Sequence, residues 1–445
     1  MYLIGNGPLV TRDEKNAFYE NGAVVVEGTF IKEIGSYDEL KQRYPEAEFI
    51  NARGKIIMPG FINAHQHIYS AFARGLSIPG KPARNFLEIL EGTWWNIDRH
   101  MTLEQVYESA MATYMECIKN GVTTVIDHHA GYGAVEGSLS AIEKAARNLG
   151  VRTCLCYEIS DRDGLYKRDK AVEETMQFLK HTYQNPDDMV KGMVGLHASF
   201  TLSDETLQKV RRENTFGAGY HIHVAEGKYD ASHCWKNHHT SIVKRLKQYG
   251  ILGKDSIAGH CIHIDETDME ILRDAETMVV HNPESNMGNG VGCPDIIGMM
   301  DKGILVGLGT DGYTNDMLES LKVANLLQKH RRGKPDRGFS EACTLLFDNN
   351  QKIAEKIFGV TTGVLKPGAK ADLILMNYKP YTPMTADNIN AHIMFGMQGA
   401  MTDTVMINGT LRMQGRKLLM INEQEVLKQA ADSAAELWKC LCQPK

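Results

Sequence analysis

Apolar positions change their spacing several times along the chain of 445 residues. Residues 1–57 hold short extended apolar runs closed by glycines, which is the pattern of β-strands and turns. Residues 58–360 alternate short apolar runs with longer segments of helical spacing, and residues 361–420 return to the β pattern. Residues 421–445 have the spacing of an amphipathic helix. We therefore predict two β-rich ends, a large α/β domain between them, and a C-terminal helix.

Eight apolar runs in the central region have the length of buried strands. Helical segments lie between them; in the clearest, residues 102–119, Thr102 and Gln105 form a capping box and Gly121 ends the helix. The predicted strands are Ile56–Met58 running toward Ala64, Thr123–Asp127, Arg152–Tyr157, Met193–His197, Gly219–Val224, Ser256–His260, Met278–His281 and Ile304–Gly309. The sequence thus predicts an α/β fold, a TIM-type (β/α)8 barrel, with a small β-sandwich built from both chain ends.

Composition excludes several classes of partner. The formal net charge is −6, whereas a nucleic-acid surface needs clustered lysine and arginine. No apolar run reaches the roughly 18 residues that span a bilayer, and Met1–Val10 lacks the features of a secretory signal. The nine cysteines are scattered and form no redox or zinc-ribbon spacing. We expect a cytoplasmic protein that acts on a small molecule and has neither nucleic-acid nor membrane partners.

Two histidines stand at the end of the first predicted strand. His65 and His67 are two residues apart, so in an extended segment both imidazoles point to the same face and reach one ion. The signal is weak alone, because the chain has 17 histidines and His221 and His223 form a second pair of the same spacing. The pair therefore needs support from other strand ends.

That support comes from three other predicted strands. His223 follows the fifth strand with Glu226 three residues on, His260 ends the sixth, and Asp311 ends the eighth. Taken singly, Glu226 fits a surface acid and Asp311 a turn former. Active sites of such barrels gather at the carboxyl ends of the strands, so the joint placement favours one site. Imidazoles with a carboxylate suit Zn²⁺, with Fe²⁺ or Mn²⁺ as options, and leave a position open for water.

Five strings of the sequence resemble the ordered signatures of the amidohydrolase superfamily. They are Pro59–His67, His223–Glu226, Gly259–His263, His281–Asn286 and Gly309–Gly312. They are most similar to the branch that contains guanine deaminase, S-adenosylhomocysteine deaminase and triazine hydrolases. The resemblance covers nearly the whole chain, including the β-rich ends. It implies a metal-dependent hydrolase that acts on carbon–nitrogen bonds and is often a homodimer or a higher homo-oligomer.

The resemblance also implies roles for the clustered residues. The ligands of one divalent metal ion, with zinc as the first choice, would be His65, His67, His223 and Asp311. Asp311 would accept the proton of the attacking water, His260 would hydrogen-bond that water, and Glu226 would protonate a ring nitrogen. Residues 194–199, at the fourth strand, hold no lysine that could bridge two metals, so a mononuclear centre is expected.

Substrate contacts are less sharply indicated. Trp94 and Trp95 have faces that stack on a flat heterocycle, and Arg74 is suited to a carbonyl or carboxylate, although the aromatics could equally pack a lid. His197 and Asn282 lie at the ends of the fourth and seventh strands and are further candidates. The roles of three histidines stay open: His128, His129 and His221.

The sequence is compatible with three functions. The leading one is hydrolytic deamination of an amino-substituted, purine-like nitrogen heterocycle. The second is ring opening of a cyclic amide, as in imidazolone-type hydrolases, at the same metal centre. The third is a non-catalytic metal-binding scaffold, which is disfavoured because a scaffold has no need of proton-transfer groups such as Glu226 and His260 beside the ligands.

Overall fold

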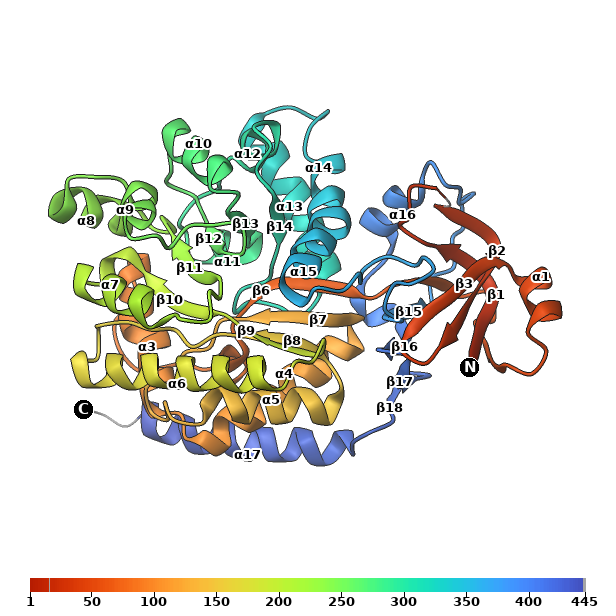
Figure 1. The fold of residues 1–445 in the computed structure, drawn as a ribbon, viewed down its shortest axis with the longest axis horizontal. Helices are drawn as coiled ribbons and strands as arrows, with labels where there is room; N and C mark the ends of the chain where they lie inside the picture. The colour runs from red at the N-terminus through yellow and green to blue at the C-terminus, as the bar shows by residue number, and fades with distance from the viewer. Residues whose placement is uncertain (16, 443–445) are drawn as a thin grey trace.

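The structure is a computed structural model that describes residues 1–15 and 17–442. Figure 1 shows a body of strands and helices on one side and a smaller sheet on the other, with the C-terminal helix running along the base of the larger body. The larger body holds the chain between the two β-rich ends. Its strands position the candidate site.

The barrel strands confirm the predicted eight β/α units. They are β6 (Phe61–Gln66), β7 (Val122–Asp127), β8 (Arg152–Leu155), β9 (Val190–Gly192) with β10 (Val194–Ala198), β11 (Tyr220–Val224), β12 (Ile257–His260), β13 (Met278–His281) and β14 (Val306–Leu308). They form two parallel sheets in the orders β6-β7-β8-β9 and β10-β11-β12-β13-β14. The fourth strand passes from one sheet to the other between β9 and β10.

Backbone contacts join the two sheets on both sides. The amide of Met193 donates to the carbonyl of Leu155 at 3.0 Å, beside the β9–β10 junction. On the other side, the amides of Thr310 and Asp311 both donate to the carbonyl of His65 at 3.0 Å. The Asn350 side chain accepts from the Leu308 amide and donates to the carbonyls of Ile62 and Leu308, each at 2.8 Å. The first and eighth strands are thereby linked.

Helices follow the strands in the order expected of a β/α barrel. After β6 come α2 (Phe86–Ile89), α3 (Trp95–His100) and α4 (Leu103–Lys119); the later barrel helices are α5 (Ser138–Leu149), α6 (Leu165–Gln184), α7 (Asp204–Glu213), α8 (Lys228–His238), α9 (Ile242–Gln248), α10 (Glu266–Asp274), α11 (Pro283–Gly288), α12 (Ile296–Asp301), α13 (Met317–Arg332), α14 (Phe339–Thr344) and α15 (Asn350–Phe358). The predicted capping box of Thr102 and Gln105 is present at the start of α4. Gly121, with a φ of 79°, follows its end.

One end of the barrel is closed by an apolar cluster. It contains residues near the amino ends of the strands, such as Met193, Ile257 and Met278, packed with Ile353 and Phe358 of α15. These five side chains are almost fully buried. Burial of this kind is the main stabilising contribution to folding, at about 25 cal/mol per Å² of apolar surface. The polar site therefore lies at the opposite end of the strands.

Both chain ends contribute to one nine-stranded sheet. Its strands are β1 (Tyr2–Val10), β2 (Phe18–Glu27), β3 (Phe30–Ser36), β4 (Glu48–Asn51), β5 (Ile56–Pro59), β15 (Leu373–Met376), β16 (Thr402–Ile407), β17 (Thr410–Gln414) and β18 (Lys417–Leu418), and α1 (Tyr37–Arg43) follows β3. The antiparallel pair β5–β15 joins the two ends. Hydrogen bonds from Ile31 to Ala369 and from Ala371 to Thr29 bring the β3 edge back, so the sheet curls over its own core. Both chain ends thus build the predicted small domain, in the form of one continuous sheet.

The predicted first barrel strand is divided at Gly60. Its first half, β5, pairs with the terminal sheet, and only the second half, β6, enters the barrel. A Cβ atom at position 60 would lie 2.2 Å from the Cγ2 atom of Thr123, so only glycine fits at this crossing. The apolar run is continuous in sequence, which is why pattern alone did not reveal the division. The domain boundaries stay predictions.

The predicted C-terminal helix is α17 (Glu423–Leu441), and a shorter helix, α16 (Ile389–Gly396), precedes β16. The Trp438 indole donates to the carbonyl of Phe72 at 2.7 Å, and the Gln105 side chain donates to the carbonyl of Ser433 at 3.2 Å. These contacts hold α17 against α4 and the segment after β6 (Figure 1). Among the described helices, none has both the length and the apolar character required to span a bilayer.

Candidate metal centre and active site

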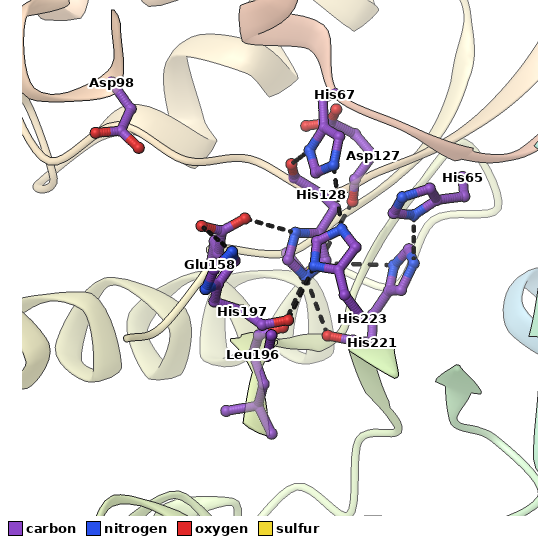
Figure 2. Close-up of polar contacts among 12 residues, drawn as sticks. His65, His67, Asp98, Asp127, His128, Glu158, Leu196, His197, His221 and His223 are labelled. Carbon is purple, nitrogen blue, oxygen red and sulfur yellow. Dashed lines mark hydrogen bonds and ion pairs between the residues drawn. The ribbon is translucent and has the colours of Figure 1, made fainter. Parts of the chain in front are cut away.

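Three histidines from two strands meet at the carboxyl end of the barrel. His65 lies on β6, His67 directly follows it, and His223 lies on β11. Their candidate ligand nitrogens all lie within 4.8 Å of one another, and all three residues are buried. Figure 2 shows the imidazoles of the three residues gathered around one space. The structure thus brings together the three predicted histidine ligands.

Hydrogen bonds to backbone carbonyls fix the ring nitrogens of two of them. His67 donates through Nδ1 to the carbonyl of His128 at 2.6 Å, and His223 donates through Nδ1 to the carbonyl of His197 at 2.9 Å. Their Nε2 atoms therefore carry lone pairs, and these two atoms lie 3.1 Å apart. Two facing lone pairs repel each other unless a cation lies between them. This geometry fits a metal ion.

The third histidine is held in a similar way. His65 Nδ1 lies 2.8 Å from Nε2 of His221, while its own Nε2 is buried and has no hydrogen-bond partner within the described chain. Burial, and then the neighbouring histidines, hold the pKa values of His65 and His223 well below the usual 6.5. Neutral imidazoles are the form that binds metals. The unpartnered Nε2 atom of His65 thus has the character of a metal ligand.

Asp311 supplies the carboxylate from the segment that follows β14. Its Oδ1 atom lies 3.4 Å from Nε2 of His67 and accepts a hydrogen bond from the Gly312 amide at 2.6 Å. Its Oδ2 atom lies 3.4 Å from Nε2 of His260 and accepts from the Ser285 hydroxyl at 2.8 Å. Burial raises the pKa of Asp311, but His67, His260 and these donors outweigh it, so the pKa is lowered. Three imidazoles and one carboxylate form a donor set that suits zinc.

His260 and Glu226 form the other side of this cluster. His260 ends β12 with a φ of 67°, and the side-chain oxygen of Asn286 holds its Nδ1 at 2.8 Å. Its Nε2 atom lies 3.5 Å from Oε2 of Glu226. Burial, and then the charge of Asp311, raise the pKa of Glu226 well above 4.5. A protonated Glu226 can donate a proton to a bound molecule.

A cavity opens beside this cluster, and its empty space, including the part open to solvent, is about 460 Å³. It is lined by His67, Tyr69, Ser70, Phe86, Leu90, Trp94, Trp95, Glu158, His197, His223, Glu226, Asn289, Asp311 and Gly312. The aromatic part comes from the segment of α2, the π-helix η2 (Leu90–Trp94) and α3. The predicted contacts Trp94, Trp95 and His197 therefore lie in the cavity wall. Its mixed lining of aromatic and polar side chains is typical of small-molecule sites.

The other two predicted substrate contacts lie elsewhere. Arg74 lines a neighbouring cavity of about 950 Å³, which shares Asp311 with the first, and pairs with Glu116 at 2.9 Å. Asn282 is fully buried beside Gly309 and lines neither cavity. Side-chain direction at the end of a strand decides such cases, and pattern does not reveal it. Their role as substrate contacts stays a prediction.

The three histidines left open by the sequence are all buried behind the site. His221 contacts His65, and Nε2 of His128 lies 3.1 Å from the carbonyls of Leu196 and His221. Neither ring nitrogen of His129 has a hydrogen-bond partner within the described residues. None of the three lines the 460 Å³ cavity. His128 and His221 thus support the site from the side away from the cavity.

Glu158 is the main lining residue that the sequence analysis missed. It directly follows the predicted third strand, and its side chain is 4% exposed and lies 3.4 Å from Nδ1 of His128 and 3.9 Å from Nε2 of His197 (Figure 2). The rule that pointed to His260 and Asp311, a polar residue at the carboxyl end of a strand, would also have found it. Tyr69 and Asn289 carried no such signal.

Comparisons with known proteins agree with this geometry. The family model described as "Amidohydrolase family" matches residues 56–412. A second model, described as "Imidazolonepropionase-like composite domain, bacteria", matches residues 22–47, which lie in the terminal sheet and α1. The chain is 30% identical over 443 residues to the 5-methylthioadenosine/S-adenosylhomocysteine deaminase of Pelotomaculum thermopropionicum, covering 98% of both chains. It is 31% identical over 440 residues to the 5'-deoxyadenosine deaminase of Methanosarcina barkeri, with the same coverage.

A solved structure has the same fold. An adenosine deaminase from Xanthomonas campestris with bound zinc superposes with a TM-score of 0.87 at 18% identity, covering 98% of both chains. The likeness extends over the barrel and the terminal sheet together, and it confirms the predicted fold class. The chain belongs to the amidohydrolase family and is a hydrolase.

Proposed function

We propose that the protein is a metal-dependent aminohydrolase that deaminates a purine-like heterocycle by hydrolysis. The observation that carries the proposal is that three histidines with converging ring nitrogens and the buried Glu226, whose pKa is raised, meet beside one cavity. The names of relatives that cover almost the whole chain support it, because they are deaminases of adenosine derivatives. A carboxyl group that is not a metal ligand is also what zinc-dependent nucleobase deaminases use as acid and base.

The ligands of the proposed metal ion are His65, His67, His223 and Asp311. Zinc is the first choice for this donor set, with iron or manganese as alternatives. When bound, a divalent cation supplies Lewis-acid activation of a water molecule. The backbone carbonyls that fix His67 and His223 keep the ligand nitrogens directed at one point.

The remaining steps are proton transfers by residues of the chain. Asp311 accepts the proton of the attacking water, since its carboxylate is ionised and faces both His67 and His260. His260 hydrogen-bonds the same water, with its ring held by Asn286. Glu226 protonates a ring nitrogen of the substrate and so makes the adjacent carbon electrophilic. The tetrahedral adduct then collapses: ammonia leaves with the proton that Asp311 had accepted, and the hydroxyl proton of the adduct passes to Glu226, which restores its carboxyl group.

The cavity wall supports a flat substrate. Trp94 and Trp95 provide aromatic surface, and the indole nitrogen of Trp95 is buried without a hydrogen-bond partner in the described chain. His197 faces the cavity from β10. We propose that these three residues contact a heterocycle, and that Arg74 meets a substituent that extends into the larger cavity.

A substrate screen tests the proposal. The purified protein is assayed for ammonia release with adenosine derivatives, other purines, pyrimidines, pterins and triazines, and its metal content is measured by elemental analysis. We expect ammonia release from at least one aminopurine and about one metal ion per chain. Loss of the ultraviolet absorbance of the ring without ammonia release would instead identify ring opening. Light scattering on the same sample tests the expected homodimer or higher oligomer, and cell fractionation tests the cytoplasmic location.

A further inference from the structure

We propose that Glu158 determines the charge of the substrate: it selects molecules that present hydrogen-bond donors or a positive charge to the wall of the cavity that Glu158 and His197 form. The inference rests on the proposed function and deepens it by naming a class of substrate. Glu158 lines the same cavity as Glu226 and Asp311. In Figure 2 its carboxylate lies on the far side of His128 and His223 from His65. A carboxylate oxygen lies within 4.8 Å of a ring nitrogen of His67 and of His223, so Glu158 faces the part of the substrate on that side of the cavity.

The imidazole of His197, next to Glu158, presents an acceptor to the cavity. His197 Nδ1 lies 2.7 Å from the hydroxyl oxygen of Thr201, and that hydroxyl already donates to the carbonyl of Ala198. His197 must therefore donate through Nδ1, which leaves a lone pair on Nε2, 3.9 Å from Oε1 of Glu158. Burial lowers the pKa of His197 to about 4, so the ring is neutral near pH 7.

His128 packs behind Glu158 and does not line the cavity. Its Nε2 atom lies 3.1 Å from the carbonyls of both Leu196 and His221, so this nitrogen carries a proton. Its Nδ1 atom lies 3.4 Å from Oε2 of Glu158 and has no hydrogen-bond partner within the described chain. An occupant of the cavity therefore meets the carboxylate of Glu158 and the Nε2 acceptor of His197, and it has to supply donors to both.

The nearby guanidinium is already engaged. Arg162 makes a two-point contact with Asp98, at 3.3 Å between Nη1 and Oδ1 and at closer range between Nη2 and Oδ2, and it lies 3.8 Å from Oε1 of Glu158. Two buried carboxylates therefore share one buried cation. Burial raises the pKa of Glu158, but His197, His128 and Arg162 outweigh it, so the pKa is lowered. A carboxylate in the wall of a cavity accepts charge-assisted hydrogen bonds, so it favours a cationic or donor-rich ligand.

A pair of matched ligands tests this selection. Benzamidine, a planar cation at neutral pH, and benzamide, its neutral analogue, are titrated into the metal-loaded protein by calorimetry. We expect benzamidine to bind about tenfold or more tightly than benzamide, because hydrogen bonds to charged groups are the stronger ones. Glu158→Gln should remove most of this preference, whereas Glu158→Asp should keep its direction.

The matched control is Glu174→Gln. Glu174 on α6 is also a buried carboxylate, but it lies away from the cavity. It accepts hydrogen bonds from the amides of Gly137 and Leu139 at the start of α5. This variant should keep the full preference for benzamidine. If Glu158→Gln does not fold, as judged by circular dichroism, the wild-type titration decides alone, because equal affinities for the two ligands overturn the proposal.

Two further outcomes would also overturn it. One is an undiminished preference for benzamidine in folded Glu158→Gln. The other is a second metal ion that is lost in this variant, since Glu158, His197 and His223 also lie close enough to bind one. Failure of the proposed function would give a different result. In that case no substrate would release ammonia, but the wild-type protein would still prefer benzamidine and Glu158→Gln would still lack this preference.

Discussion

The two ends of the barrel are built on opposite principles. At the end closed by α15, apolar side chains such as Ile353 and Phe358 are packed without exposure, and the amide of Asn350 has all its groups hydrogen-bonded. At the carboxyl end, His65 and His260 each bury an Nε2 atom that has no hydrogen-bond partner in the described chain. Burying such groups costs free energy. One end of the barrel therefore stabilises the fold, whereas the other end keeps unpaired polar groups that serve binding and chemistry at a cost in stability.

The backbone shows the same contrast. Ala225, His260, Cys261 and Asp311 at the carboxyl end all have positive φ, a conformation that residues other than glycine rarely adopt. Such residues cluster where a site needs a particular geometry, and the surrounding structure must hold them. Among them, His260 and Asp311 are the proposed proton-transfer residues. Strain and unpaired polar groups thus coincide at one end of the barrel.

The largest expected effect comes from Asp311→Asn at the carboxyl end. The amide cannot accept the water's proton, so the rate of ammonia release should fall by about 10²–10⁴-fold. Stability should fall far less than activity, because the side chain keeps its size and the three histidines of the cluster remain. Steady-state kinetics and urea unfolding measure the two quantities. Asp432→Asn, a matched change of an exposed residue on α17, should alter neither; full activity in Asp311→Asn would contradict the proposed role.

Ile353→Ala should show the reverse pattern at the closed end. The side chain is fully buried among barrel residues, so its truncation should lower the free energy of unfolding by about 2–5 kcal/mol. The kcat per folded molecule should be preserved, since no residue of the cavity moves. Leu326→Ala, at a position 63% exposed on α13, is the control and should cost far less. A fall in kcat as large as that in Asp311→Asn would mean that the two ends are not independent.

Metal removal sharpens the comparison further. A ligand that binds only the folded state at about 100 times its Kd adds about 2.7 kcal/mol of stability. Chelation should therefore lower the free energy of unfolding by about this amount, and added zinc should restore it. Differential scanning calorimetry with and without chelator measures the effect. We expect it to be reduced in His223→Ala and retained in Ile353→Ala; equal responses of both variants would argue against a metal ion at the histidine cluster.

The sequence was informative where one rule applied to many positions. Eight strands and the residues at their ends could be predicted, because parallel strands place their carboxyl ends on one side, and this led to His65, His223 and Asp311. The division at Gly60 could not, since β5 and β6 form one apolar run and only tertiary pairing separates them. Asn282 lies at a strand end as predicted, yet its side chain is buried and lines neither cavity, so its role as a substrate contact stays a prediction. Pattern locates the backbone of a residue, whereas packing decides where its side chain points.

The smallest expected effect is that of removing the cap of α4, a helix that supports the carboxyl end of the barrel. Thr102 caps α4 by accepting a hydrogen bond from the amide of Gln105, directly after the helix that carries Trp95. Thr102→Ala should lower the free energy of unfolding by about 1 kcal/mol, which is the usual cost of losing such a cap. The kcat should not change, because Thr102 contributes no atom to the cavity.

Thr215→Ala, at an exposed threonine in the turn after α7, provides the control for that cap and should leave the unfolding free energy unchanged within a few tenths of a kcal/mol. If Thr102→Ala lowered kcat strongly at full folding, the position of Trp95 would depend on the start of α4, and the carboxyl end would have to be regarded as extending into its supporting helices. If only the free energy of unfolding falls, the strained and unpaired groups of the carboxyl end are confined to the residues that face the cavity. In that case, the helices around the barrel stabilise the fold, as the closed end does, and take no part in the chemistry.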